Sequence, residues 1–164
     1  MIPLRQVICS MLWTLAALAP NEAVAVDDRK CTTPIATVDS KYTPGQVWKF
    51  KNRLGESASR VTILRVETLP KLGLIIHIRI DGVQFKNCTG GPAPTSIAHA
   101  PFSKEAMDDS VTQLIRSGIQ VPEYMAGYRE WLAHCGGAYT ISLAEMVNAD
   151  ETTFNAGLGC PAQK

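Results

Sequence analysis

The chain has 164 residues, of which 46% are hydrophobic, and it carries 16 Lys and Arg against 15 Asp and Glu. This near balance of charge provides no electrostatic footprint for nucleic acid or an anionic membrane, so we expect neither as a partner. The length suits a short targeting segment followed by one domain, and no internal repeat or long low-complexity run divides the sequence further.

The N-terminal residues have the features of a secretory signal peptide. Arg5 supplies a positive charge, an apolar run follows over residues 7–19, and the small residues Ala23-Val24-Ala25 stand where a signal peptidase cleaves. The apolar run is too short to cross a bilayer. We therefore expect a signal peptide over residues 1–25, cleaved near Ala25. The mature domain over residues 26–164 is expected to be periplasmic or secreted and not inserted in the membrane.

Four cysteines follow the signal peptide: Cys31, Cys88, Cys135 and Cys160. An even number of cysteines in an exported chain predicts disulfides, here two. A zinc site or a redox centre would need close pairs such as C-x-x-C, which the sequence lacks, so no metal is expected. Four cysteines allow three pairings, and we expect Cys31–Cys88 with Cys135–Cys160, which would tie down the N-terminal segment and the C-terminal tail.

The first half of the expected domain has the patterns of β-strands. Alternating residues over 48–53 predict a half-buried strand, residues 60–69 a second and residues 72–80 a third. Asp81-Gly82 is a hairpin-turn signal, after which residues 83–86 are expected to return as a fourth strand. Together these pieces predict a meander of three to four antiparallel strands.

The strand expected over residues 72–80 has the clearest alternation. One set of its side chains is apolar and is expected to face the core: Leu74, Ile76, Ile78 and Ile80. The alternate set is expected to face solvent: Ile75, His77, Arg79 and Asp81. We therefore interpret His77 as an ordinary exposed residue.

The second half of the expected domain has the patterns of helices. Ser103 is an N-cap for a helix expected to run to about Ser117. Pro122 opens a second helix, and Ser142 with Glu145 forms a capping box that opens a third, shorter one. Strands followed by helices predict an α+β fold, with a small antiparallel sheet of three to four strands, two to three packed helices and two disulfides.

His99 and Ser103 are the candidate catalytic residues. They lie beside an expected helix N-terminus, which can hold an anion, with Glu105 and Asp108 within reach. Each has a structural alternative, because Ser103 can serve only as the N-cap and His99 can be a buried strand residue bonded to the backbone. His134 is interpreted as a residue that caps a helix end. The sequence has no known catalytic, phosphate-binding or dinucleotide motif, and we expect no cofactor.

Tyr128, Arg129 and Trp131 are the candidate binding residues, since aromatic residues and arginine form interface hot spots. The alternative is that the aromatic residues pack the second helix on the sheet. Cys135 continues the same helical spacing and is expected to face the core.

Three segments resemble motifs in a group of small exported bacterial proteins that are mostly uncharacterised. These segments are His99-Ala100-Pro101-Phe102-Ser103, Gly127-Tyr128-Arg129-Glu130-Trp131 and Ala138-Tyr139-Thr140-Ile141. The resemblance spans roughly residues 72–147 and implies a small single domain in a bacterial envelope. It implies no activity and no residue roles.

Two functions from different classes follow from these observations. The first is an exported, non-enzymatic binding protein, such as an inhibitor, an immunity protein or an envelope accessory factor, whose partner is another envelope or secreted protein. The alternative is a small hydrolase or ligand-binding domain centred on His99 and Ser103. The sequence does not indicate an oligomeric state.

Overall fold

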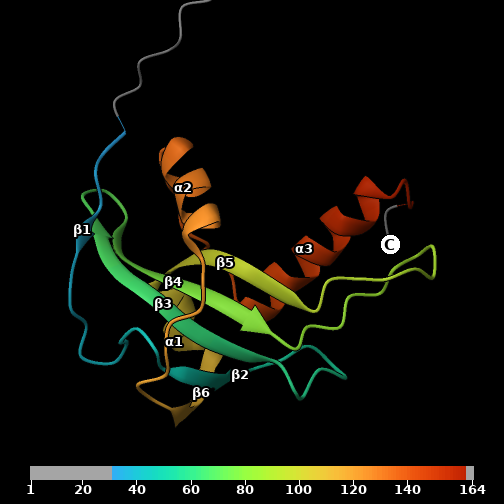
Figure 1. The fold of residues 1–164 in the computed structure, drawn as a ribbon, viewed down its shortest axis with the longest axis horizontal. Helices are drawn as coiled ribbons and strands as arrows, with labels where there is room; N and C mark the ends of the chain where they lie inside the picture. Colours follow the sequence, from blue (N-terminus) through green and yellow to red (C-terminus); the bar gives the residue numbers. More distant parts are fainter. Residues whose placement is uncertain (1–30, 162–164) are drawn as a thin grey trace, which may run out of the picture.

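The computed structural model describes residues 31–161, so the predicted signal peptide and its cleavage site lie outside the described residues. Within them, the chain forms one antiparallel sheet of six strands together with three helices (Figure 1). The strands are β1 (Ile35–Ala36), β2 (Val47–Phe50), β3 (Arg60–Leu69), β4 (Gly73–Asp81), β5 (Ser96–Ser103) and β6 (Val111–Arg116). The helices are α1 (Lys104–Ser110), α2 (Met125–Ala133) and α3 (Leu143–Gly157). The predicted α+β class is confirmed, and the sheet is larger than predicted.

The strands follow the order β5-β4-β3-β2-β6, and β1 pairs with the C-terminal end of β3. The two long central strands, β3 and β4, form a hairpin that begins at Arg60 opposite Asp81 and closes at Leu69 opposite Gly73. Gly73 has a φ of +74°, a backbone conformation that favours glycine at this tight connection. The hairpin is the frame on which the candidate site is built.

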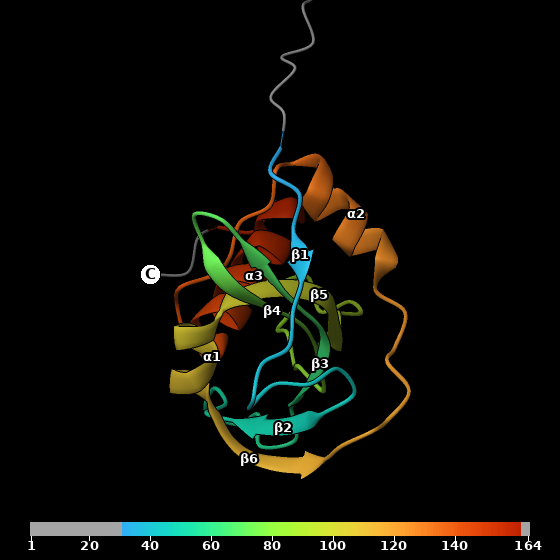
Figure 2. The ribbon, with the colours of Figure 1, turned by 90° about the vertical axis from the view of Figure 1, so that its left-hand side faces the viewer.

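Both faces of the sheet are covered by helices, α1 and α3 on one and α2 on the other (Figure 2). The larger core lies under α1 and α3 and joins Met107, Leu143 and Met146 to Ile76 and Ile78 of β4. A smaller apolar cluster lies under α2 and consists of Leu69, Ile75, Tyr128 and Trp131. The sheet is therefore the middle of three layers.

Helix α2 covers the face of β4 that was predicted to be exposed, so that prediction is wrong for part of the strand. Ile75 and His77, expected to face solvent, are both 0% exposed because α2 lies over that face. Arg79 and Asp81, further along the same face, are partly exposed as expected and pair with each other. Alternation identified the two faces of the strand correctly but could not show that both are covered.

Two predicted elements are replaced by others. Residues 83–86 do not form a returning strand, and β5 pairs with β4 in their place. The helix predicted from Ser103 to Ser117 ends at Ser110, and the chain continues as β6, paired with β2. The β-branched and aliphatic residues of β6 suit a strand, and pairing with β2 outweighs the helical spacing that the sequence also shows.

The N-terminal signals of α1 and α3 are confirmed, whereas α2 begins at Met125, three residues after the Pro122 that was predicted to open it. The side chain of Ser103 accepts a hydrogen bond from the backbone N–H of Ala106, as an N-cap does. The capping box of Ser142 and Glu145 opens α3, which at 15 residues is longer than predicted and buries Leu143, Met146 and Val147. Cys135 lies beyond the end of α2 at a φ of +62° and is exposed, so its expected place in the core is wrong.

The fold contains the two predicted disulfides, but their predicted pairing is wrong. Cys31 pairs with Cys135, and Cys88 pairs with Cys160. Residues 82–95 extend beyond the sheet to the C-terminal end of α3, which brings Cys88 to Cys160, whereas the C-terminal end of α2 lies near the start of the described chain (Figure 1). Bridges across 104 and 72 residues each stabilise the fold by about 4–5 kcal/mol in the chain-entropy account.

The disulfides are consistent with an extracellular or periplasmic location. A search of residues 31–161 finds no helix with the length and apolar character needed to cross a membrane.

Candidate functional site

A buried carboxylate lies between the sheet and α2. Glu67 of β3 is 0% exposed, and its Oε1 lies 3.0 Å from Nε2 of His77 on β4. The Tyr128 hydroxyl, from α2, donates to both carboxylate oxygens at 3.2 and 3.0 Å, and Nε of Arg65 donates to Oε2. Arg65 and Glu67 share a face because they are two residues apart on β3, and Arg65 lies opposite His77 in the register.

His99 of β5 extends this arrangement toward solvent. Its Nε2 lies 2.9 Å from Nδ1 of His77. Because Nε2 of His77 donates to a carboxylate, Nδ1 of His77 is the acceptor, and Nε2 of His99 is the donor. No described group bonds to Nδ1 of His99. Within residues 31–161, Oδ1 of Asn52 is the one buried side-chain nitrogen or oxygen that has no partner. Nδ1 of His99 is therefore not fully buried, and water reaches it.

Both imidazoles are neutral at neutral pH. Burial, with smaller contributions from the nearby His99 and Arg65, lowers the pKa of His77 to about 3. Burial also lowers the pKa of the partly buried His99. We call the five side chains Arg65, Glu67, His77, His99 and Tyr128 the buried histidine cluster.

Helix α2 packs tightly on this cluster. A Cβ at Gly127 would lie 2.8 Å from Cβ of His99, so only glycine permits so close an approach. The Tyr124 ring stacks on His99, with ring centroids 6.4 Å apart and planes at 17°. Trp131 presents its ring edge to His77, with centroids 4.6 Å apart and planes at 83°. The position of α2 is therefore coupled directly to the two histidines.

An apolar pocket of about 320 Å³ opens beside the buried histidine cluster. Its lining residues are Pro101, Trp131, Gly137, Ala138 and Tyr139. Pro101 lies opposite His77 in the β4–β5 register, and Trp131 Nε1 donates to the Gly137 carbonyl at 2.8 Å. Tyr139 is 38% exposed, so the pocket opens to solvent. The cluster and the pocket thus share a wall, formed by Trp131.

The candidate catalytic residues His99 and Ser103 are not brought together. They point to the same face of β5, but four residues at roughly 3.3 Å each separate them by about 13 Å. Ser103 is engaged as the α1 N-cap. Asp108, thought to be within reach, accepts hydrogen bonds from Lys41, Tyr42 and Lys104.

The candidate binding residues divide into two sets. Tyr128 and Trp131 are buried on the side of α2 that packs against the sheet. Tyr128 belongs to the buried histidine cluster, and Trp131 lines the pocket. Arg129 is exposed on the same helix. The sequence interpretation missed Arg65, Glu67 and His77. One signal could have found them, namely that the apolar Ile75 lies on the face of its strand that was expected to be exposed.

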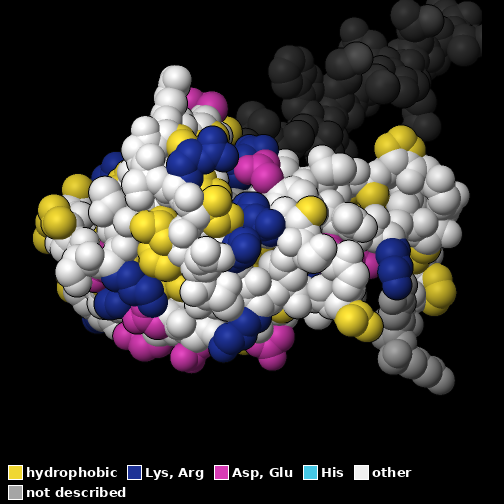
Figure 3. Space-filling model, turned by 90° about the horizontal axis from the view of Figure 1, so that it is seen from below, with side chains coloured by type: hydrophobic (Ala, Val, Ile, Leu, Met, Phe, Trp, Pro, Cys, Tyr) yellow, Lys and Arg dark blue, Asp and Glu magenta, His cyan; other side chains and the backbone are white. Residues whose placement is uncertain are grey.

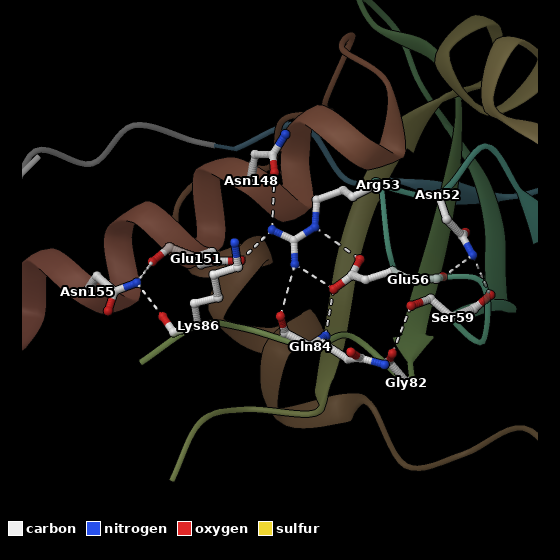
Figure 4. A network of polar contacts seen from close by, with 10 residues as sticks. All are labelled: Asn52, Arg53, Glu56, Ser59, Gly82, Gln84, Lys86, Asn148, Glu151 and Asn155. Atoms are coloured by element: carbon white, nitrogen blue, oxygen red, sulfur yellow. Dashed lines mark hydrogen bonds and ion pairs between the residues drawn. The ribbon is translucent and has the colours of Figure 1, made fainter. Parts of the chain in front are cut away.

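A second polar site surrounds Arg53, in the loop between β2 and β3 (Figure 4). All five N–H groups of its guanidinium are used: they bond to both carboxylate oxygens of Glu56, to Glu151, to Oδ1 of Asn148 and to the Gln84 carbonyl. Glu56 is 4% exposed and also accepts from the Gln84 backbone N–H. A cavity of about 510 Å³ lies beside these side chains. With its donors satisfied, Arg53 ties this loop to α3 and has no N–H left for a ligand.

The edge strand β6 exposes apolar side chains to solvent. On the side of the molecule where β2 and β6 lie, hydrophobic side chains gather among Lys and Arg (Figure 3). Leu114 and Ile115 of β6 are 41% and 42% exposed. The β2–β6 register shifts twice, and such irregularities make an edge a poor template for a further strand.

Within the described residues, no group of three or more His, Cys, Asp or Glu side chains is arranged to hold a metal ion. Comparison with known protein families, characterised proteins and solved structures finds no match for this chain.

Proposed function

We propose that this is an exported, non-enzymatic protein that binds another protein through the apolar pocket beside α2. The observation that carries the proposal is the pocket itself: it is open to solvent, apolar and walled by Pro101, Trp131 and Tyr139. Tyr and Trp in such pockets supply large contact area at low conformational cost, and they dominate interface hot spots. An apolar side chain of a partner fits this chemistry.

The pocket suits a side chain of a partner better than a small-molecule ligand. Its volume of about 320 Å³ is at the lower end of the range for ligand pockets, about 300–1,000 Å³. Its rear wall is rigid, because Trp131 is held by the Gly137 carbonyl and by the His77 ring. A preformed wall lowers the entropy lost on binding. Arg129, exposed on α2, is a candidate for polar contacts outside the pocket.

Export completes the proposal. The predicted signal peptide directs the chain out of the cytoplasm, and the two disulfides suit an oxidising compartment. We infer that the partner is another envelope or secreted protein. An inhibitor, an immunity protein and an envelope accessory factor would all bind in this way.

Filling the pocket is expected to abolish the interaction. Ala138→Trp places a large side chain in the pocket, so recovery of a partner from native envelope extract should fall at least about tenfold, as for loss of a hot spot. The measurement is quantitative capture with the tagged exported protein. Ala156→Trp on α3 is the matched control, since Ala156 is exposed and lies outside the pocket. Equal recovery with both variants would reject the pocket, and recovery of the protein alone together with a turnover activity would reject the whole proposal.

The alternative, a hydrolase or ligand-binding domain centred on His99 and Ser103, has less support. Ser103 is engaged as a helix cap, and His99 lines neither of the two cavities described above. Nδ1 of His99 is open to water, and Nε2 of the same ring bonds to His77, which bonds to Glu67; among residues 31–161, no hydroxyl or thiol nucleophile is bonded to Nδ1.

A further inference from the structure

We propose that the buried histidine cluster is a proton-sensitive latch: in mildly acidic surroundings, protonation of the His77–His99 pair loosens α2 from the sheet and opens the wall of the apolar pocket. The effect on partner binding rests on the proposed function. The loosening of α2 does not, because it follows from contacts within this chain.

The first proton is expected on Nδ1 of His99, the one nitrogen of the pair without a partner among the described residues. This proton leaves the hydrogen bond from Nε2 of His99 to His77 in place. It also puts a positive charge beneath Gly127, the third residue of α2, to which Nδ1 is close. The first turn of a helix carries partial positive charge, so a cation there is unfavourable.

The other charged groups around the pair do not offset this charge. On β3, the Glu67 carboxylate already accepts from Arg65, His77 and Tyr128, and Arg65 adds a cation. On β4, Arg79 is paired with Asp81. At α2, the phenols of Tyr124, the N-cap, and of Tyr128 face the pair, and burial raises the pKa of Tyr128 to about 12.

A proton on His77 would act more directly. Nδ1 of His77 accepts from His99, so a second N–H there would face the first across 2.9 Å, and the bond between the rings would be lost. Trp131, edge-on to His77, would lose its support at the same time. Protonation at either ring therefore favours separation of α2 from the sheet.

Helix α2 is the element best placed to move. Residues 117–124 before it and residues 134–138 after it lack helix and strand. Of the three helices in residues 31–161, α2 packs on one face of the sheet, whereas α1 and α3 pack on the other (Figure 2). The Cys31–Cys135 disulfide anchors its C-terminal end, so loosening is expected first at the N-terminal turn, over His99.

The sign of the pH dependence follows from the lowered pKa values of the two histidines. A histidine released to solvent regains an ordinary pKa near 6.5, so protons bind the loosened state more tightly than the closed one. Below about pH 6.5, each unit of acidification shifts the equilibrium toward the loosened state by up to about tenfold for each proton bound.

Hydrogen exchange of the exported protein, with no partner present, tests the latch. Between about pH 7.5 and about pH 5, after correction for intrinsic rates, protection of α2 amides should fall at least about tenfold while that of α3 amides is kept. His99→Gln keeps a neutral donor to His77 and removes one of the two titrating rings, so it should clearly reduce the fall in α2 protection on acidification. His134→Gln, which removes an exposed histidine at the end of the same helix, should leave the pH dependence intact.

Three results would overturn the latch: constant α2 protection, parallel loss of protection in α2 and α3, or a fall in α2 protection as large in His99→Gln as in the unaltered protein. If that variant does not fold, the imidazole resonances of His99 in the unaltered protein decide. Their titration midpoint should coincide with that of α2 exchange, and separate midpoints would reject the coupling. Failure of the Ala138→Trp capture test would reject the partner site and leave these exchange results unaffected.

Discussion

Replacement of Glu67 by alanine is expected to lower the free energy of unfolding by about 3–5 kcal/mol. The carboxylate is 0% exposed and accepts from Arg65, His77 and Tyr128, so its loss strands two buried donors and one cation. Urea unfolding of the exported protein, followed by circular dichroism, measures the change.

Two variants control for this result. Glu67→Gln keeps an acceptor oxygen for His77 and Tyr128 but no charge for Arg65, and should cost roughly half as much. Glu130→Ala removes a carboxylate on α2 whose side chain is 78% exposed, and should change stability by no more than about 0.5 kcal/mol. A loss of less than about 1 kcal/mol for Glu67→Ala would show that the buried histidine cluster does not hold α2 to the sheet.

Arg53→Ala is expected to destabilise the fold by a similar amount, about 3–5 kcal/mol. The substitution leaves Glu56, which is 4% exposed, and the largely buried Glu151 without their cation. It also releases the loop between β2 and β3 from α3 (Figure 4). The same unfolding measurement applies.

The conservative variant sharpens this second prediction. Arg53→Lys keeps the charge but cannot bond both oxygens of Glu56 together with Glu151, Asn148 and Gln84, so we expect it to recover less than half of the loss. Arg79→Ala is the matched control, because the Arg79–Asp81 pair is partly exposed and worth at most about 1 kcal/mol. Equal effects of Arg53→Ala and Arg79→Ala would contradict the role given to Arg53.

Local signals predicted those elements that local physics determines. The cap at Ser103, the capping box at Ser142 and the strand over residues 60–69 are all present where the sequence indicated them. Pairing between distant strands could not be foreseen in this way. Residues 111–116 have helical spacing as well as β-forming residues, and their pairing with β2, more than 60 residues earlier in the chain, decides the outcome.

The candidate site could be predicted only in part, because it too depends on strands that are distant in the sequence. His99 was singled out from its position in the sequence, but its partner His77 and the Glu67 carboxylate bonded to His77 come from two other strands. His77 was placed in solvent because alternation cannot tell whether a second helix covers the outer face. The disulfide pairing depended on the same missing layer, since Cys135 meets Cys31 only because α2 packs on the face away from α3.

The most direct test of the proposed binding face is site-specific photo-crosslinking in the cells that export the protein. A photoreactive phenylalanine analogue replacing Tyr139, at the mouth of the pocket, should give one discrete adduct with a second protein. The same analogue at Ala156, exposed on α3, should give none. No adduct from position 139, or the same adducts from both positions, would contradict the assignment of this face as the binding site.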